Sequence, residues 1–103
     1  MQARALEEYR RAVTLDGTRR PLRLRLAQCL WETEQYFPAM NEWRAVLVRS
    51  PGNIEAQLGL ARAAVKAGDR LEAAQEYLRI LQIVPDQPEA RRELARLGFR
   101  PNS

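Results

Sequence analysis

A nine-residue segment recurs three times in this chain, and consecutive copies begin 34 residues apart. Every copy has alanine at its first position, glutamate at its fourth and an aromatic residue at its fifth. The three copies are ALEEYRRAV at 5–13, AMNEWRAVL at 39–47 and AAQEYLRIL at 73–81. A period of this length predicts an array of similar units, each of which packs on its neighbours because it cannot bury its apolar face alone.

The segments between these copies repeat with the same period, and their apolar residues recur at three- and four-residue spacing. Leu26, Leu60 and Leu94 form one set in register. This spacing is typical of amphipathic helices, and no stretch rich in β-branched residues alternates apolar and polar residues as a strand does. Turn-forming residues separate the apolar stripes, so we expect six helices, near 2–15, 21–34, 38–49, 53–67, 70–83 and 88–97.

Three prolines lie where helices are expected to begin, at Pro21, Pro38 and Pro88. Proline is favoured at the first helical position, because the N–H that it lacks has no intrahelical acceptor there. Asn53 and Asp69 precede two further stripes, and we expect their side chains to cap the fourth and fifth helices.

This 34-residue unit of two helices resembles the tetratricopeptide repeat. The family's leucine-glycine, alanine, aromatic and closing proline positions are filled by Leu26-Ala27 and Leu60-Ala61, by Ala39 and Ala73, by Trp43 and Tyr77, and by Pro51 and Pro85. The family's opening tryptophan and its tyrosine are replaced, by Arg23, Gln57 and Arg91 and by Leu30, Ala64 and Gly98. The resemblance implies an all-α fold, a right-handed α-solenoid of antiparallel helix pairs with about six helices.

We expect one domain over 1–103, because a chain of 103 residues has room for a single core. In that domain, 1–19 would be the second helix of a partial repeat. Residues 20–53 and 54–87 would be complete repeats, and 88–103 a closing helix and tail.

The residues that support most enzyme chemistry are scarce here. Histidine is absent and Cys29 is the single cysteine, which excludes disulfides within the chain, metal sites built on His or Cys pairs, and catalysis by histidine. The five glycines are dispersed, unlike those of a phosphate-binding loop. We therefore expect no catalytic residue, metal or cofactor, and a buried structural role for Cys29. Without an apolar run of roughly 18 residues or a secretory signal, a cytoplasmic location without membrane contact is expected.

In the tetratricopeptide family the first helices of the pairs line a concave groove that binds peptides. The groove residues that the resemblance implies are Leu24, Gln28, Trp31, Leu58, Arg62, Val65, Lys66, Arg92 and Arg96. Among these, Arg62 and Arg96 would contact carboxylates, Gln28 would bind amides, and the leucines and Val65 would form an apolar floor. The expected function is a non-catalytic scaffold whose concave groove binds a peptide segment of a protein partner, one with acidic groups beside a hydrophobic anchor.

Other interpretations of these surfaces are open. Arginine rows are often solvated helix faces, here paired with Glu89 and Glu93, and the aromatic rings of Trp31 and Phe99 can be core or lid residues. The net charge of +4 fits nucleic-acid binding, although acidic residues interspersed along every unit disfavour it. Finally, the helix expected at 2–15 leaves an apolar side open, through which the chain could self-associate.

Overall fold

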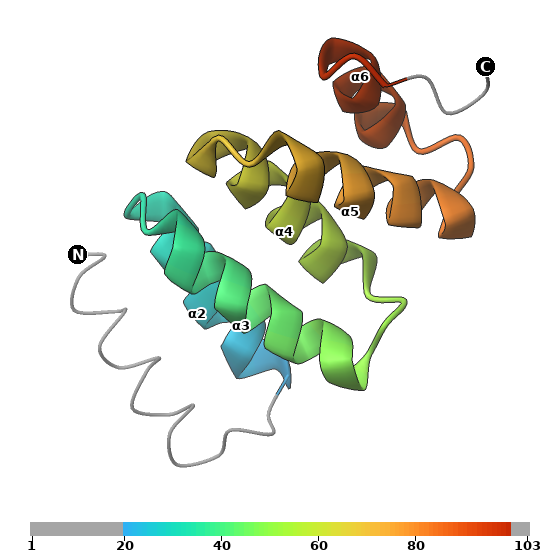
Figure 1. Ribbon diagram of the computed structural model, residues 1–103. Helices are drawn as coiled ribbons and strands as arrows, with labels where there is room; N and C mark the ends of the chain where they lie inside the picture. The colour runs from blue at the N-terminus through green and yellow to red at the C-terminus, as the bar shows by residue number, and fades with distance from the viewer. Residues whose placement is uncertain (1–19, 100–103) are drawn as a thin grey trace.

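The computed structural model describes residues 20–99, and this part of the chain contains five helices and no strand. Figure 1 shows the helices following one another along the molecule from α2 to α6. Their bounds are α2 Arg20–Glu32, α3 Tyr36–Arg49, α4 Ile54–Ala67, α5 Arg70–Ile83 and α6 Pro88–Arg96. The helix expected at 2–15 lies outside the described residues. The chain has the all-helical architecture of a helical repeat solenoid.

Each helix packs against the next one in the sequence, and α2 also packs against α4. Contacts between such near neighbours are what a stack of helix pairs requires, since each pair covers the apolar face of the one before it. The first pair is α2 with α3, the second is α4 with α5, and α6 follows as a single helix among the described residues.

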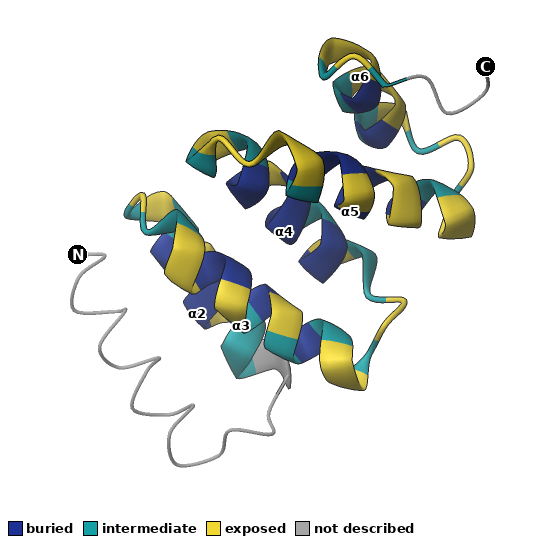
Figure 2. Cartoon of the chain, in the orientation of Figure 1, coloured by how far each residue is buried: buried dark blue, intermediate teal, exposed yellow. Residues whose placement is uncertain are grey.

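The buried side chains form two apolar clusters that meet on α4. Leu60 belongs to the cluster shared with α2 and α3, whereas the adjacent Ala61 belongs to the cluster shared with α5 and α6. In Figure 2 the buried residues accordingly lie along the helix faces that are turned toward neighbouring helices. Ala27 and Ala61 are fully buried, as a small residue at a point of close helix approach should be. Cys29 is also buried in the core, as expected from the sequence.

Polar side chains cap the second pair at the predicted positions. The Asn53 side chain accepts a hydrogen bond from the backbone N–H of Ala56 at 2.9 Å, and the Asp69 side chain accepts one from the N–H of Glu72 at 3.1 Å. Between these helices Gly68 adopts a left-handed conformation with φ of 82°. A residue in this conformation ends a helix at low cost only when it lacks a Cβ, so Gly68 fixes the turn from α4 to α5.

The turn between the second and third helices lies about two residues earlier than the bounds expected from the sequence. The helix α2 ends at Glu32, before the expected residue 34, and α3 begins at Tyr36, two residues before Pro38. Pro38 is tolerated there because the N–H groups of a first helical turn have no intrahelical acceptor. The chain reverses direction at Glu34, which has a left-handed φ of 61° without being glycine.

A glycine on α4 allows close approach of α3. A Cβ atom at Gly59 would overlap the indole ring of Trp43. Trp43 is only 3% exposed, so its ring has no free space into which it could move. The contact between the first and second pairs therefore depends on the missing side chain at Gly59.

Candidate binding groove

A cavity of about 280 Å³ opens along the first helices of the pairs and α6. Trp31 comes from the last turn of α2, and α4 supplies the central part of the lining. The complete lining is Trp31, Arg62, Val65, Lys66, Tyr77, Glu89, Glu93 and Arg96. The cavity thus combines an apolar side with several charged groups of both signs.

The structure brings five of the nine sequence-predicted groove residues together in this cavity, namely Trp31, Arg62, Val65, Lys66 and Arg96. The other four do not line it. Leu24 and Leu58 are half-buried and pack against the two core clusters, while Gln28 and Arg92 are exposed. This cavity therefore covers only part of the predicted row of residues, and it is centred on the C-terminal half of α4.

A bidentate ion pair joins α4 to α6 at the groove. Arg62 donates from Nε to Glu89 Oε2 at 2.6 Å and from Nη2 to Glu89 Oε1 at 2.5 Å. Hydrogen bonding to the guanidinium lowers the pKa of the Glu89 carboxyl and raises the pKa of Arg62. Such a two-point contact is geometrically specific and favours the ionised form of both groups.

The hydroxyl of Tyr77 extends this pair to a third helix, because it donates to Glu89 Oε2 at 3.4 Å. Burial raises the pKa of Tyr77, and the negative charge of Glu89 raises it further. Tyr77 is therefore neutral at ordinary pH and can act as the donor. Its hydroxyl, Glu89 and Arg62 together hold α5, α6 and α4 around one end of the groove.

The remaining cations of the groove are less firmly paired. Lys66 is exposed and makes no ion pair with any residue in the described part of the chain. The side chain of Arg96 is 72% exposed, and its Nη1 lies 3.4 Å from the carboxylate of Glu93, three residues earlier on the same helix. Exposed pairs of this kind contribute little to stability. Lys66 and Arg96 can therefore pair with a carboxylate of a ligand while the protein loses little stability from existing contacts.

The apolar side of the groove is formed by Trp31 and Val65, both half-buried. The Trp31 ring packs edge-on against Tyr36 with centroids 5.5 Å apart, and lies 6.4 Å from the ring of Trp43. These contacts hold the indole in place, so a bound group would meet a preformed surface. Trp31 thus has a packing role and also lines the groove.

The sequence pattern of the tetratricopeptide repeat matches residues 39–97, which is more than half of the chain. The chain belongs to the tetratricopeptide repeat family. Tetratricopeptide repeats generally mediate interactions between proteins, and the fold is generally a non-catalytic scaffold. No curated protein is found to match the chain.

Residues 20–99 of this tetratricopeptide repeat chain contain neither a candidate membrane span nor a candidate metal site. None of the described helices is long and apolar enough to span a membrane. Within the same residues, no group of three Cys, Asp or Glu side chains is arranged so that it could hold a metal ion.

Three groove residues were not predicted as such, namely Tyr77, Glu89 and Glu93. Spacing along α6 correctly suggested that Glu93 pairs with the nearby arginines, since Arg96 and Arg92 lie 3.4 Å and 3.8 Å from it. Glu89 instead pairs with Arg62, which is 27 residues away on another helix. The signal for this contact is the tetratricopeptide stacking itself, which brings successive first helices together. Phe99 is half-buried and packs against the apolar cluster shared by α4, α5 and α6.

Proposed function

We propose that the chain is a non-catalytic scaffold that binds a peptide segment of a partner protein in the groove of α2, α4 and α6. The segment carries a carboxylate next to an apolar anchor. Membership of the tetratricopeptide repeat family supports the general role in protein interaction. The observation that carries the specific proposal is the cavity in which loosely held cations lie beside the preformed apolar surface of Trp31 and Val65.

In this proposal Lys66 and Arg96 contact the carboxylate of the peptide. Lys66 has no competing ion pair among the described residues, and Arg96 exchanges one weak contact with Glu93 for a stronger one. The apolar anchor lies against Trp31 and Val65, where it removes half-buried apolar surface from water. Charge then selects the partner, while burial of the anchor contributes most of the affinity.

Arg62 has a different role from the one that the sequence suggests. Because Glu89 already occupies it at two points, a peptide carboxylate can gain full contact with Arg62 only by displacing Glu89. The pair positions α6 against α4, and so it shapes the groove that the peptide enters. Reversing the charge of Arg62 would place two carboxylates together, so a loss of binding could come from a loss of folding. A variant of Lys66 avoids this ambiguity.

A selection of random peptides on immobilised protein, followed by affinity measurement in solution by fluorescence polarisation, tests the proposal. We expect the selected peptides to combine Asp or Glu with an aromatic or large aliphatic residue. The double variant Lys66→Glu with Arg96→Glu is expected to lose about tenfold or more in affinity. The matched control is Arg25→Glu with Arg49→Glu, which reverses two exposed charges outside the groove and should change affinity by less than about twofold.

Equal loss in both double variants would mean that only net charge matters, and it would contradict the groove assignment. An unselective peptide pool would contradict it as well. Binding to random-sequence oligonucleotides that is tighter than peptide binding and falls steeply with salt would move the function to nucleic acid. Self-association through residues 2–15 stays a prediction that sedimentation of the full chain can check.

A further inference from the structure

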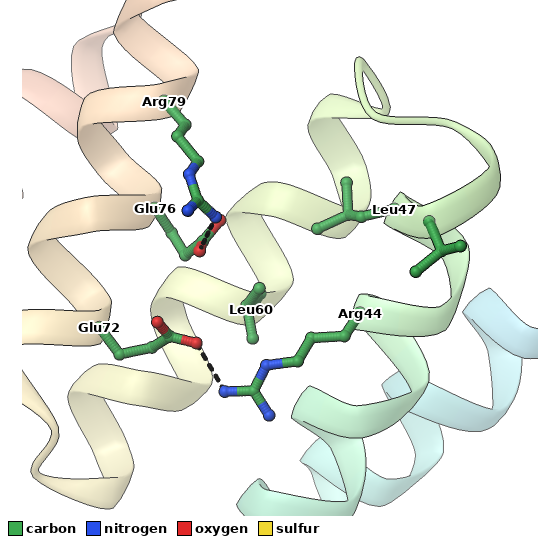
Figure 3. A pocket seen from close by; sticks show the side chains of 7 residues that line it. Arg44, Leu47, Leu60, Glu72, Glu76 and Arg79 are labelled. Carbon is green, nitrogen blue, oxygen red and sulfur yellow. Dashed lines mark hydrogen bonds and ion pairs between the residues drawn. The ribbon is translucent and has the colours of Figure 1, made fainter.

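A second cleft lies in the layer formed by the second helices of the pairs. Figure 3 shows side chains of α3 on one side and of α5 on the other, with Leu60 of α4 between them. The cleft encloses about 270 Å³ and is lined by Arg44, Leu47, Val48, Leu60, Glu72, Glu76 and Arg79. The groove described above has its walls mainly on α2, α4 and α6, so the two spaces are separate.

The feature that points to a ligand is the carboxylate of Glu76. Its side chain is 2% exposed, and Oε2 accepts a hydrogen bond from Arg79 Nη1 at 2.7 Å. The other oxygen, Oε1, is buried and has no hydrogen-bond partner in the described structure. Buried acceptors are almost always paired, because an unpaired one loses its bonds to water without compensation. An external donor that reached Oε1 would remove this cost.

The first helix pair shows which donor fits this position. Glu42, one period before Glu76, accepts a hydrogen bond from the guanidinium of Arg23 on α2 at 2.8 Å. One period after Arg23 the chain has Gln57, whose amide oxygen is also buried without a partner. The second pair therefore retains the carboxylate but lacks the arginine that binds its equivalent in the first pair.

The rest of the cleft suits a long basic side chain. Leu47 and Val48 present apolar surface to an aliphatic stem, and the buried Leu60 completes the lining. The volume of about 270 Å³ is about nine times that of a water molecule in the liquid, which is enough for one such side chain. A second carboxylate, Glu72, lies on the same side and is paired with Arg44 at 2.5 Å.

We propose that this cleft binds an arginine side chain presented by another protein, with its guanidinium donating to Oε1 of Glu76. The stem of the arginine packs on Leu47 and Val48. In the unbound protein the guanidinium of Arg79 is paired with the Glu76 carboxylate. Because the Arg79 side chain is 59% exposed, water can solvate this guanidinium when the incoming arginine displaces it. The chain then has two recognition sites of opposite preference, a groove for acidic segments and a cleft for a basic side chain.

Titration of the ¹⁵N-labelled full chain with N-acetyl-arginine amide, followed by NMR, tests this site. We expect saturable shifts of the α3 and α5 amides that flank the cleft, with a dissociation constant on the order of millimolar, as for a small fragment. N-acetyl-citrulline amide keeps the chain length but has a neutral urea, and it should bind about tenfold more weakly because charge-assisted hydrogen bonds are stronger.

Glu76→Gln should weaken binding of the arginine probe about tenfold, since it removes the charge without changing the shape. The control Glu55→Gln, at an exposed position of α4 outside the cleft, should leave the affinity within about twofold. If Glu76→Gln does not fold, the location of the shifts and the citrulline comparison decide.

Several results would overturn the proposal. These are an absence of saturable shifts, equal binding of the citrulline probe, binding that survives Glu76→Gln, and shifts located at Glu89 and Glu93 in the groove. A concentration-dependent dimer that is lost in Glu76→Gln would identify a second copy as the occupant, and would contradict the assignment to another protein.

Discussion

The two helix pairs have the same residue classes in the same register, yet they satisfy their polar groups differently. In the first pair, Glu42 of α3 is held by Arg23 of α2. In the second pair the equivalent positions are Glu76 and Gln57, and each leaves one buried oxygen without a partner. Among the described residues, the first pair therefore pairs this carboxylate internally, whereas the second pair leaves two buried acceptors open to an external donor.

The aromatic residue of the repeated segment also differs between the pairs, and again the second pair has the outward-directed polar group. Trp43 in the first pair is enclosed by α4 and depends on Gly59. Tyr77, its equivalent in the second pair, places a hydroxyl next to Glu89 at the groove. Unsatisfied or externally directed polar groups tend to occur where a protein trades stability for function. In the two proposed sites, the second pair and α6 supply most of the charged groups, while α2 and α3 of the first pair supply part of the apolar lining.

The largest effect is expected from truncating a core residue of α4, Leu60, which also lines the cleft between α3 and α5. Leu60→Ala should lower the free energy of unfolding by about 2–5 kcal/mol, because Leu60 is fully buried and the cavity cannot collapse completely. Leu71→Ala removes the same atoms from a side chain that is 69% exposed. This variant should change the free energy of unfolding by less than about 0.5 kcal/mol. Urea unfolding curves of both variants measure the difference.

A smaller loss is expected at the contact between the pairs. Gly59→Ala should destabilise the fold by about 1–3 kcal/mol, because overlap with the Trp43 ring outweighs the better helix propensity of alanine. The equivalent residue in the first pair, Arg25, is exposed, and Arg25→Ala should be nearly neutral. A stable Gly59→Ala variant would show that α3 and α4 do not approach this closely in solution.

Removing the arginine of the first pair should make it behave like the second. Arg23→Gln leaves Glu42 without its partner and is expected to cost about 1 kcal/mol, since Glu42 is still largely shielded from water. Thermal unfolding at neutral pH gives the value. Unchanged stability would mean that the Arg23–Glu42 contact does not distinguish the two pairs.

Glu76→Gln should raise the free energy of unfolding, whereas Arg23→Gln lowers it, and the size of the gain should depend on pH. Burial raises the pKa of Glu76 above its ordinary value of 4.5, so the ionised carboxylate disfavours the folded state at neutral pH. The variant should be more stable than the wild type at pH 7 by about 1 kcal/mol. As pH falls toward 4.5 the wild-type carboxyl takes up a proton in the folded state, and the advantage should shrink.

Glu42→Gln provides the comparison for that measurement. It breaks the pair with Arg23, so it should lower stability at pH 7 where Glu76→Gln raises it. Melting temperatures recorded from pH 7 to 4.5 would separate the two carboxylates. Parallel curves for the two variants would contradict the difference between the pairs.

The smallest effect is expected at the turns that end the first helices. Glu34 in the first pair and Gly68 in the second occupy equivalent positions, and both have positive φ, of 61° and 82°. Glu34→Gly should therefore stabilise the fold by about 0.5–1 kcal/mol. Glu34→Ala keeps the Cβ and should give no such gain. A destabilised glycine variant would show that the carboxylate of Glu34 matters more than its backbone conformation.

Much of the fold could be predicted from the sequence because the 34-residue period and the apolar spacing are local signals. The caps at Asn53 and Asp69 followed from residue chemistry in the same way. The start of α3 could not be predicted, because a proline in the first turn does not mark which position of that turn it occupies. The left-handed conformation of Glu34 could not be predicted either, since glycine is the residue that normally indicates such a turn.

The candidate site was less predictable than the fold. The family resemblance predicted Lys66 and Arg96 as groove residues, and both line the cavity, but the pairing of Arg62 with Glu89 depends on how two helices meet in space. Charge patterns along one helix reach only three or four residues, so they cannot reveal a contact 27 residues apart. The cleft at Glu76 has a sequence signal after all, in the change from Arg23 to Gln57 across one period.

The most direct test of the functional account is to map where a selected acidic peptide binds. The full chain labelled with ¹⁵N would be titrated with that peptide, and the backbone and indole shifts would be followed by NMR. The account predicts that the shifts concentrate on the indole of Trp31, on α4 around Lys66 and on α6 around Arg96. Shifts confined to the outer faces of α3 and α5, with Trp31 unaffected, would contradict it.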